Sequence, residues 1–349
     1  MRLKVLHVLN RLAGGGAERL VLDLVNHSDM DIEVSVATVM SGGELAPVFA
    51  DAGIKVRCAN RKRLHPGLSA IRTLRRWCRD VDVVHTHLWG GDFFGGIAAR
   101  SVGRPLISTV HNTRGDGWLR DWILGHARSA DICVGVSPDA LSFARSYGVP
   151  EERLRCIPNG VDLSRFRKSA WEPGPPWRLL FVGRLTEQKG LDCLIRALVG
   201  LNDVQLYVVG DGVDRGKLED LAASLGVDVV FRGWTMNVAK EYENSHLVVI
   251  PSRWEGFGLV AVEAMASGRP VLGTAVGGLE AVLADVGAVV QSDDVDGLRK
   301  EIERLIGNTK ELEDRAAAGA EYAQKWSIRK TVATYEELYR ALAFSPKQP

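Results

Sequence analysis

The sequence has 349 residues, which is enough for two domains of ordinary size. Hydrophobic residues make up 46% of it and charged residues 25%, proportions that are typical of a globular protein with a substantial core. Its 44 Lys and Arg and 43 Asp and Glu nearly cancel to a net charge of +1, which excludes a strongly basic nucleic-acid-binding protein and an acidic disordered tail as descriptions of the whole chain.

The first half of the chain alternates short apolar runs with segments of helical period. The apolar runs are rich in Val and Ile and bounded by turn residues, which predicts buried strands at 3–9, 32–38, 54–58, 82–87, 105–110 and 131–136. The segments between them predict helices at about 16–27, 43–52, 66–79, 90–101, 118–129 and 138–146. This alternation indicates βαβ units and a parallel sheet.

The alternation is interrupted between about 157 and 178. Residues 168–178 contain three Pro and a Gly between two Trp, which is typical of a linker. The pattern then restarts, with strands expected at 179–183, 204–209, 228–231, 247–251, 270–273 and 286–290 and a helical tail at 295–343. We therefore expect an α/β protein of two tandem doubly wound domains, with ligands at the carboxyl ends of the strands and a cleft between the domains.

A glycine-rich loop follows the first predicted strand. Gly14, Gly15 and Gly16 precede a predicted helix, and such a loop lets the backbone approach a ligand while the helix N-terminus attracts an anion. It is not a complete dinucleotide-binding fingerprint, which would need a further Gly where Arg19 stands. A tight strand-to-helix turn is an equally good interpretation of this loop taken alone.

Two cations follow the first strand of the second half. Arg184, in Gly183-Arg184-Leu185, and Lys189, in Lys189-Gly190, are five residues apart. Arg offers a planar fork and Lys a point charge, so the pair can clamp a diphosphate. The alternative is a solvated basic loop, and the position at a strand end favours a binding role.

Two carboxylates follow the fourth strand of the second half. Glu255 lies in a glycine-flanked loop, and Glu263 lies eight positions later in an apolar helix, where an unpaired charge is rare. Carboxylates accept paired hydrogen bonds from vicinal diols, so Glu263 suits a ribose and Glu255 a sugar. The helix N-terminus near Gly258 favours phosphate. The alternative is a buried Glu paired with Arg253 or Arg269.

Three histidines stand near the ends of two strands in the first half. His85 and His87 have the spacing of a metal pair on one strand face, but no third ligand pattern accompanies them, so we expect no metal. His111 comes just after a strand, where it could contact a substrate. A core or capping role is the alternative for each histidine, and the better one for His85.

Residues 68–80 predict a basic amphipathic helix. Leu68, Ile71, Leu74 and Cys78 share one face, and arginines crowd the others at positions 72, 75, 76 and 79. Such a helix can lie on an anionic membrane surface. The alternative, which we favour, is a crossover helix that packs its apolar stripe on the sheet and exposes its arginines.

Taken together, these elements resemble the retaining glycosyltransferases of family 4, which have the GT-B fold. The resemblance runs over nearly the whole chain, and the ordered set of motifs is far more specific than any one of them. The motifs are Gly14-Gly15-Gly16-Ala17-Glu18, Ile157-Pro158-Asn159-Gly160-Val161-Asp162, Gly183-Arg184-Leu185 with Lys189-Gly190, Gly210-Asp211-Gly212, and the Glu-x7-Glu element from Glu255 to Glu263.

The resemblance implies a role for each matching position. Arg184 and Lys189, with Gly183, would bind the donor diphosphate, and Glu263 would hold the ribose. Glu255 would hold the donor sugar with the backbone amides of Phe257, Gly258 and Leu259. Gly15 and Gly16 would approach the donor from the opposite domain, His111 would lie beside the sugar, and Gly233 and Trp234 would lie near the base.

The resemblance makes Glu255, His111, Arg184 and Lys189 the catalytic set, as stabilising groups. No general base is assigned, because the departing phosphate can take the acceptor proton in a retaining reaction. The implied domains are 1–165, on the acceptor side, and 166–327, for the donor, with a last helix at about 328–345 that crosses back to the first domain. No metal or other cofactor is implied.

The expected reaction is hexose transfer from a nucleotide diphosphate sugar, with a UDP-sugar favoured on family frequency, to a saccharide or lipid-linked acceptor in polysaccharide or glycoconjugate synthesis. A nucleotide-sugar 2-epimerase of similar fold would act on the donor alone. A non-catalytic two-domain sugar-binding protein would share the paired domains but would not need Arg184, Lys189, Glu255 and Glu263 together. Nucleic acid is not an expected partner.

Charge and cysteine usage point to a location. Residues 1–165 carry 22 Lys and Arg against 17 Asp and Glu, and the remainder carries 22 against 26, so a basic half with a net charge of +5 precedes an acidic half with −4. An anionic or membrane-held acceptor is therefore expected on the first domain. Five scattered cysteines, no apolar run near the ~18–20 residues that span a bilayer and no secretory signal predict a cytoplasmic protein, peripheral on the inner face of the membrane if helix 68–80 binds there.

Overall fold

The computed structural model describes residues 2–60, 67–113, 129–170 and 172–344, and it divides into two compact units. The first unit comprises residues 1–160 together with 328–349, and the second comprises 161–327. The chain therefore passes between units after Gly160, rather than after residue 165, and again after Ser327. The expected helix at 118–129 lies almost wholly outside the described residues.

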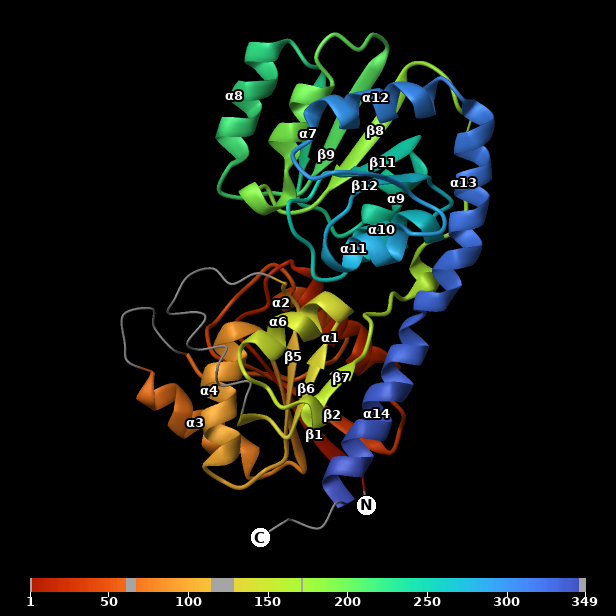
Figure 1. Ribbon diagram of the computed structural model, residues 1–349. Coiled ribbons are helices and arrows are strands. Elements are labelled where there is room, and N and C mark those ends of the chain that lie inside the picture. The colour runs from red at the N-terminus through yellow and green to blue at the C-terminus, as the bar shows by residue number, and fades with distance from the viewer. Residues whose placement is uncertain (1, 61–66, 114–128, 171, 345–349) are drawn as a thin grey trace. The chain divides into compact units, whose positions relative to one another are not determined.

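The first unit is built on a seven-stranded parallel sheet (Figure 1). Its strands, in spatial order, are β3 (Val56–Cys58), β2 (Ile32–Thr38), β1 (Leu3–Leu9), β4 (Val83–His87), β5 (Leu106–Val110), β6 (Ile132–Gly135) and β7 (Leu154–Cys156). Its helices are α1 (Gly16–His27), α2 (Ala46–Asp51), α3 (Leu68–Cys78), α4 (Leu88–Arg100), α6 (Pro138–Ser146) and α14 (Ile328–Phe344). The predicted parallel α/β architecture is confirmed.

The last helix, α14, belongs to the core of the first unit. Its residues Ile328, Val332, Tyr335 and Tyr339 are buried against one face of the sheet, together with residues of β1, β4 and β5. Helix α14 also packs beside α1 (Figure 1). The C-terminal segment therefore completes the hydrophobic core of the N-terminal domain, as expected for the predicted fold.

The second unit is built on a six-stranded parallel sheet. Its strands, in spatial order, are β10 (Val229–Gly233), β9 (Val204–Val209), β8 (Trp177–Val182), β11 (Leu247–Ile250), β12 (Val271–Thr274) and β13 (Ala288–Val290). Its helices are α7 (Leu191–Ala197), α8 (Arg215–Leu225), α9 (Val238–Glu243), α10 (Leu259–Ala266), α11 (Gly277–Leu283), α12 (Val295–Ile306) and α13 (Thr309–Tyr322). The helical tail is thus confirmed as α12, α13 and α14.

Strand order reverses at one point in each sheet. In the first unit β1 pairs with both β2 and β4, and in the second β8 pairs with both β9 and β11. Open α/β sheets bind ligands at the carboxyl ends of the strands where the order reverses. The loops after β8 and β11 are those that carry Arg184 and Glu255, so topology places both predicted loops at this position of the second unit.

Helix α3 uses its apolar stripe inside the protein. Ala70, Leu74 and Cys78 are fully buried in a core shared with α4, whereas Leu68 is 63% exposed. The arginines of this helix, at positions 72, 75, 76 and 79, are exposed. This is the crossover-helix interpretation, and it leaves the arginines and the isolated Leu68 available to an external surface. Among the described residues, no helix combines the length and apolar character that crossing a bilayer requires.

Candidate functional site in the second unit

Glycines bring the loops at the end of β8 into close contact with their neighbours. Gly210 has a φ of +135°, and a Cβ there would lie 1.9 Å from the carbonyl oxygen of Gly183. Gly190 has a φ of +63°, and a Cβ there would lie 2.0 Å from the carbonyl oxygen of Pro251. Only glycine fits either position. The Gly210-Asp211-Gly212 motif therefore supports the Arg184 loop, and Gly190 joins that loop to the one that carries Glu255.

Lys189 and Glu255 form an ion pair across these two loops. The Lys189 Nζ donates directly to the Glu255 Oε1, and the two side chains are only 15% and 11% exposed. The Ser252 hydroxyl donates to the same oxygen over 3.0 Å. Glu255 therefore pairs with Lys189 and not with Arg253, the alternative considered for a buried Glu.

Arg253 and Arg269 have structural partners of their own. Arg253 donates to both carboxylate oxygens of Asp192 over 2.9 Å and to Asp293 over 2.7 Å. Burial alone would raise the pKa of Asp192, but the hydrogen bonds and charge of Arg253 hold it below its ordinary value. Arg269 is fully buried and donates to the carbonyl oxygens of Tyr242 and Glu243 over 2.8 Å. Both arginines thus fasten α7, α9 and adjoining loops.

Arg184 is exposed, and Gln188 orients its guanidinium. Its Nη2 donates to Gln188 Oε1 over 3.1 Å, and Gln188 Nε2 donates to the Trp254 carbonyl oxygen over 3.0 Å. The backbone N–H of Arg253 donates to the Gln188 carbonyl oxygen over 2.8 Å. Gln188 therefore links the cationic loop to the loop that carries Glu255, a role that sequence analysis did not assign.

Glu263 is held by a buried tyrosine from another helix. The Tyr242 hydroxyl, on α9, donates to the Glu263 Oε2, on α10, over 2.8 Å. Burial and the charge of Glu263 raise the pKa of Tyr242 well above its ordinary value, so the hydroxyl remains a donor at neutral pH. Glu263 itself is half-buried. This contact fixes one oxygen of the carboxylate.

Helix α10 begins beside these carboxylates. Its N-cap is Gly258, with a φ of +101°, and Leu259 is its first residue. Phe257 is 5% exposed and packs edge-on against the Trp326 ring, with 5.2 Å between ring centroids. The first N–H groups of a helix have no partner within it and favour an anion. Phe257 anchors the turn that orients them.

The predicted base-side residues lie at the end of the edge strand β10. Gly233 is the last residue of the strand, with a φ of +75°, and Trp234 follows it with 41% exposure. The side chain of the preceding Arg232 lies over the ring of Tyr207, with 5.1 Å between the guanidinium carbon and the ring centroid.

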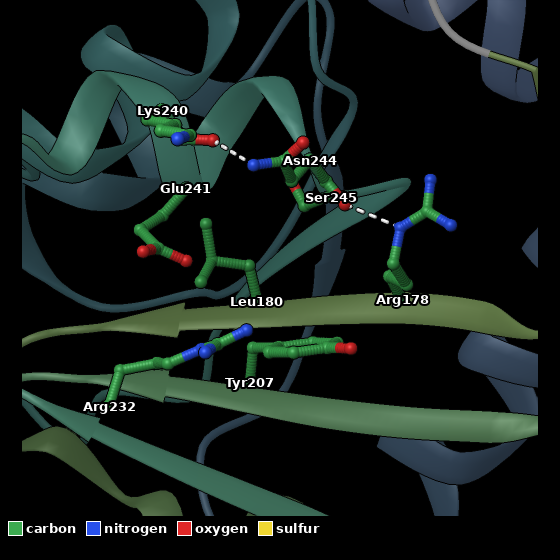
Figure 2. Close-up of a pocket in the computed structure, with 8 residues that line it drawn as sticks. All are labelled: Arg178, Leu180, Tyr207, Arg232, Lys240, Glu241, Asn244 and Ser245. Atoms are coloured by element: carbon green, nitrogen blue, oxygen red, sulfur yellow. Dashed lines mark hydrogen bonds between the residues drawn. The ribbon is translucent and has the colours of Figure 1, made fainter.

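Figure 2 shows that Arg232 and Tyr207 line a hollow on the face of the sheet. Its volume is about 600 Å³, and its lining is Arg178, Leu180, Tyr207, Arg232, Lys240, Glu241, Asn244 and Ser245. None of the predicted donor-binding side chains lines this hollow. The Arg178 Nε at one side donates to the Asn244 carbonyl oxygen over 2.6 Å, which fixes that guanidinium in place.

The remaining predicted site residues belong to the first unit. Gly15 is the N-cap of α1 and Gly16 its first residue. A Cβ at Gly15 would lie 2.7 Å from a carboxylate oxygen of the buried Glu18. His111, just after β5, is half-buried, and its Nε2 is 3.2 Å from the Nδ1 of His87. Gly15, Gly16 and His111 therefore belong to this unit, and the other predicted site residues belong to the second unit.

Two families of known proteins match this chain. A family model described as glycosyl transferases group 1 matches residues 164–326, and one described as glycosyltransferase family 4 matches residues 14–165. A D-inositol 3-phosphate glycosyltransferase from Nocardiopsis dassonvillei is 32% identical over 308 residues, which cover 74% of this chain and 70% of that protein. An uncharacterized glycosyltransferase from Methanocaldococcus jannaschii is 34% identical over 58% of this chain and 60% of its own length.

Solved structures show the same fold. The Anabaena protein HepE in complex with UDP-glucose aligns with a TM-score of 0.88 at 21% identity, over 98% of this chain and all of that one. A sucrose-phosphate synthase from Thermosynechococcus elongatus aligns with a TM-score of 0.82 at 21% identity, over 98% of this chain and 99% of that one.

Proposed function

This chain belongs to the group 1 and family 4 glycosyltransferases and has their GT-B fold of two α/β domains, and from that premise we propose that it moves a hexose from a nucleotide diphosphate sugar to an acceptor hydroxyl with retention of anomeric configuration. The observation that carries the donor assignment is the Lys189–Glu255 ion pair at the point where strand order reverses in the second unit.

The ion pair explains how one small site serves both a negative and a neutral part of the donor. Without a ligand, Lys189 neutralises Glu255. When the diphosphate is bound, the Lys189 ammonium bridges carboxylate and phosphate, and Glu255 accepts hydrogen bonds from sugar hydroxyls. The exposed Arg184 and the first N–H groups of α10 add further positive charge. These groups stabilise the charge that develops on the departing diphosphate.

Glu263 is the proposed ribose ligand. Because Tyr242 donates to its Oε2, the carboxylate has a fixed orientation in which it can accept hydrogen bonds from a vicinal diol. The proposed site contains fixed cations where other enzymes use a metal, so we propose metal-independent transfer. The proposal also includes the prediction that His111, which belongs to the first unit, contacts the donor sugar.

Retention follows from the proposed role of the leaving group. The acceptor attacks from the side on which the diphosphate departs, and the phosphate oxygen takes the acceptor proton. Glu255 and Lys189 then act as stabilising groups and no side chain acts as the base. The anomeric configuration of the product, measured by NMR from an α-linked donor, tests this: an α-linked product supports retention and a β-linked product overturns it.

UDP-sugar is the favoured donor because the structural neighbour HepE was solved with UDP-glucose. A second acceptor class deserves a direct assay, because several relatives are named D-inositol 3-phosphate glycosyltransferases. We propose saccharide and lipid-linked acceptors in polysaccharide or glycoconjugate synthesis first, and a phosphorylated cyclitol second. The net positive charge of residues 1–165 suits either an anionic acceptor or an anionic membrane.

Ligand-dependent thermal stability tests the donor proposal. We expect UDP to raise the melting temperature more than GDP or ADP, and Arg184→Ala to reduce that rise while leaving the unliganded protein unchanged. Arg196→Ala is the matched control, because Arg196 is an exposed arginine on α7 outside the proposed site. Full transfer rates at low donor concentration in Arg184→Ala would contradict the diphosphate assignment. Incubation of the donor alone distinguishes a 2-epimerase, which would change the sugar without an acceptor.

A further inference from the structure

A continuous chain of hydrogen bonds runs through the core of the first unit and ends at His111. From α14 it passes from the Tyr335 hydroxyl to Thr109 Oγ1 (3.2 Å) and on to His85 Nε2 (2.7 Å). His85 Nδ1 then contacts the Tyr339 hydroxyl (2.8 Å), which contacts His7 Nε2 (3.4 Å). His7 Nδ1 meets His87 Nε2 (2.9 Å), and His87 Nδ1 meets His111 Nε2 (3.2 Å).

These histidines do not form an open metal site. The ligand atoms of His7, His85 and His87 lie within 4.8 Å of one another, which is a geometry that could hold an ion. All six ring nitrogens of these three residues, however, already have hydrogen-bond partners in the chain. A metal would have to displace several of these buried hydrogen bonds at once. The arrangement is therefore better described as a hydrogen-bonded chain.

Every internal member of the chain has one hydrogen to donate. Burial lowers the pKa of His7 to about 3 and of His111 to about 4, and the pKa values of His85 and His87 lie well below the ordinary value. All four imidazoles are thus neutral at pH 7, with one N–H and one bare nitrogen each. A hydroxyl that accepted from both of its neighbours would leave its own hydrogen buried without a partner, which is costly. The favoured arrangement is therefore the one in which all members donate in the same direction.

The direction is set at the tyrosine end. Tyr335 is fully buried, and within the described part of the chain its hydroxyl makes one hydrogen bond, with Thr109. If Tyr335 only accepted, its own hydrogen would be buried without a partner, which is costly. Tyr335 therefore donates, and Thr109, His85, Tyr339, His7 and His87 each donate to the next member. His111 Nε2 then accepts, and the hydrogen of His111 is on Nδ1.

We propose that Tyr335 and Tyr339 are positioning residues that act through this chain to hold His111 in its Nδ1–H tautomer, so that His111 meets substrate as a hydrogen-bond donor through Nδ1. The contact between His111 and substrate rests on the proposed function, which places His111 beside the donor sugar. The tautomer of His111 is a property of the free protein alone. The C-terminal helix thereby determines the chemical state of a residue that follows β5.

Nitrogen-15 NMR of the full-length protein with labelled histidine tests the tautomer directly, because the chemical shifts of a protonated and a bare ring nitrogen differ. The signals of His111 are identified by their loss in His111→Gln. We expect a single Nδ1–H species in the wild type at pH 7.5. In Tyr335→Phe we expect a second population with the hydrogen on Nε2, because the chain has lost the hydroxyl that sets its direction.

Thr331→Val is the matched control, because it removes another buried hydroxyl of α14, which donates to the Pro158 carbonyl oxygen over 3.0 Å and lies outside the chain. We expect its His111 spectrum to match the wild type. An Nε2–H tautomer in the wild type, or an unchanged spectrum in both Tyr335→Phe and Tyr339→Phe, would overturn the inference.

Kinetics separate this inference from the proposed function. If only one tautomer is competent, kcat/KM falls by the fraction of that tautomer, so equal populations in Tyr335→Phe reduce it about two-fold. A changed spectrum with unchanged kcat/KM would support the tautomer but contradict the role of His111 at the substrate. A loss of kcat/KM with an unchanged spectrum would contradict the tautomer mechanism.

Discussion

Lys189 and Glu255 form an ion pair with each other. From the sequence, they were assigned to different parts of the donor. Their side chains are 15% and 11% exposed, and each neutralises a charge that would otherwise be largely removed from water. This relationship makes the site a preformed, electrically balanced unit, and it predicts how the two residues respond to substitution separately and together.

Lys189→Met and Glu255→Gln should each weaken stability and catalysis. Each single change leaves the partner as an unbalanced, mostly buried charge, so we expect a loss of about 1–3 kcal/mol in the free energy of unfolding. We expect kcat/KM to fall roughly 100-fold or more, because an electrostatic stabiliser of the leaving group or sugar is lost. Urea denaturation and initial-rate measurements with a UDP-sugar check both effects.

The double variant Lys189→Met/Glu255→Gln distinguishes the two effects. It removes both charges, so part of the lost stability should return while catalysis remains low. Strictly additive losses of stability would show that the ion pair contributes nothing, and a double variant with restored activity would contradict the donor assignment.

Tyr242→Phe should weaken nucleotide binding through Glu263. The change removes the hydroxyl that donates to Glu263 Oε2 but preserves the packing of the ring. We expect a loss of about 1.5–3 kcal/mol in the free energy of unfolding, as for a hydrogen bond to a charged group. The Kd for UDP should rise several-fold, measured by calorimetry, because the carboxylate is no longer oriented.

Tyr207→Phe is the control for this change. Tyr207 belongs to the same unit and lines the hollow on the face of the sheet. The change removes its hydroxyl, which donates to Gln205. If Tyr242→Phe bound UDP as tightly as the wild type does, Tyr242 would serve only the fold.

The site was proposed from the sequence because most of its residues follow predicted strands. Arg184, Lys189 and Glu255 stand in loops that follow predicted strands, and Glu263 stands in the helix after the second of these loops. Periodicity alone predicts those strands. Tyr242 was missed because it stands 21 residues before its partner, on a different helix, and no local pattern marks that contact. Ser252 and Gln188 were missed for the same reason, since their roles depend on how two loops meet.

His7 shows a signal that could have been used. It interrupts the apolar run Val5-Leu6-His7-Val8-Leu9 in a strand predicted to be buried, and a buried polar residue needs a partner. Sequence could not name that partner, because His87 is 80 residues away and becomes a neighbour only when β1 pairs with β4. The amphipathic pattern of 68–78 was likewise readable, but only the packing of α3 against α4 shows what covers its stripe.

The buried histidines predict acid sensitivity of the first unit. The folded-state pKa values of His7, His85, His87 and His111 are lowered by burial, to about 3 for His7 and about 4 for His111. Below pH ~6.5 the unfolded chain binds protons that the folded chain excludes, so stability is present above that pH and is lost as pH falls toward these values. Urea unfolding at pH 7.5, 6 and 5 should show this loss, with a shallower slope in His7→Asn. A stability independent of pH in this range would contradict it.

Asp92 has the opposite effect on the pH dependence of stability. Burial raises its pKa to about 7, against hydrogen bonds from Thr86 and Ser108 that lower it. The contribution of Asp92 to the free energy of unfolding is therefore fully present below its ordinary pKa and is lost as pH rises through about 7. Both hydroxyls donate to Oδ1, which an amide retains, so Asp92→Asn should be more stable than the wild type at pH 8 and lose that advantage at pH 5. Thermal melts at the two pH values check this, and an equal shift at both would contradict it.

Association with an anionic membrane should be purely electrostatic. Because Leu74 and Cys78 are buried in the core, α3 has no continuous apolar stripe to insert. Its exposed arginines and the isolated Leu68 are what it presents to a surface. Each arginine near an anionic membrane contributes about 1 kcal/mol, and salt screens this attraction over about 8 Å at physiological ionic strength. We therefore expect flotation with phosphatidylserine vesicles at low salt, which declines as salt rises and is lost when Arg72, Arg75 and Arg76 are changed to Glu.

Leu68→Ala is the control, since Leu68 is exposed and uncharged. Flotation that resists high salt would require the apolar face of α3 to leave the core, and absence of flotation at low salt would remove the membrane from the proposal.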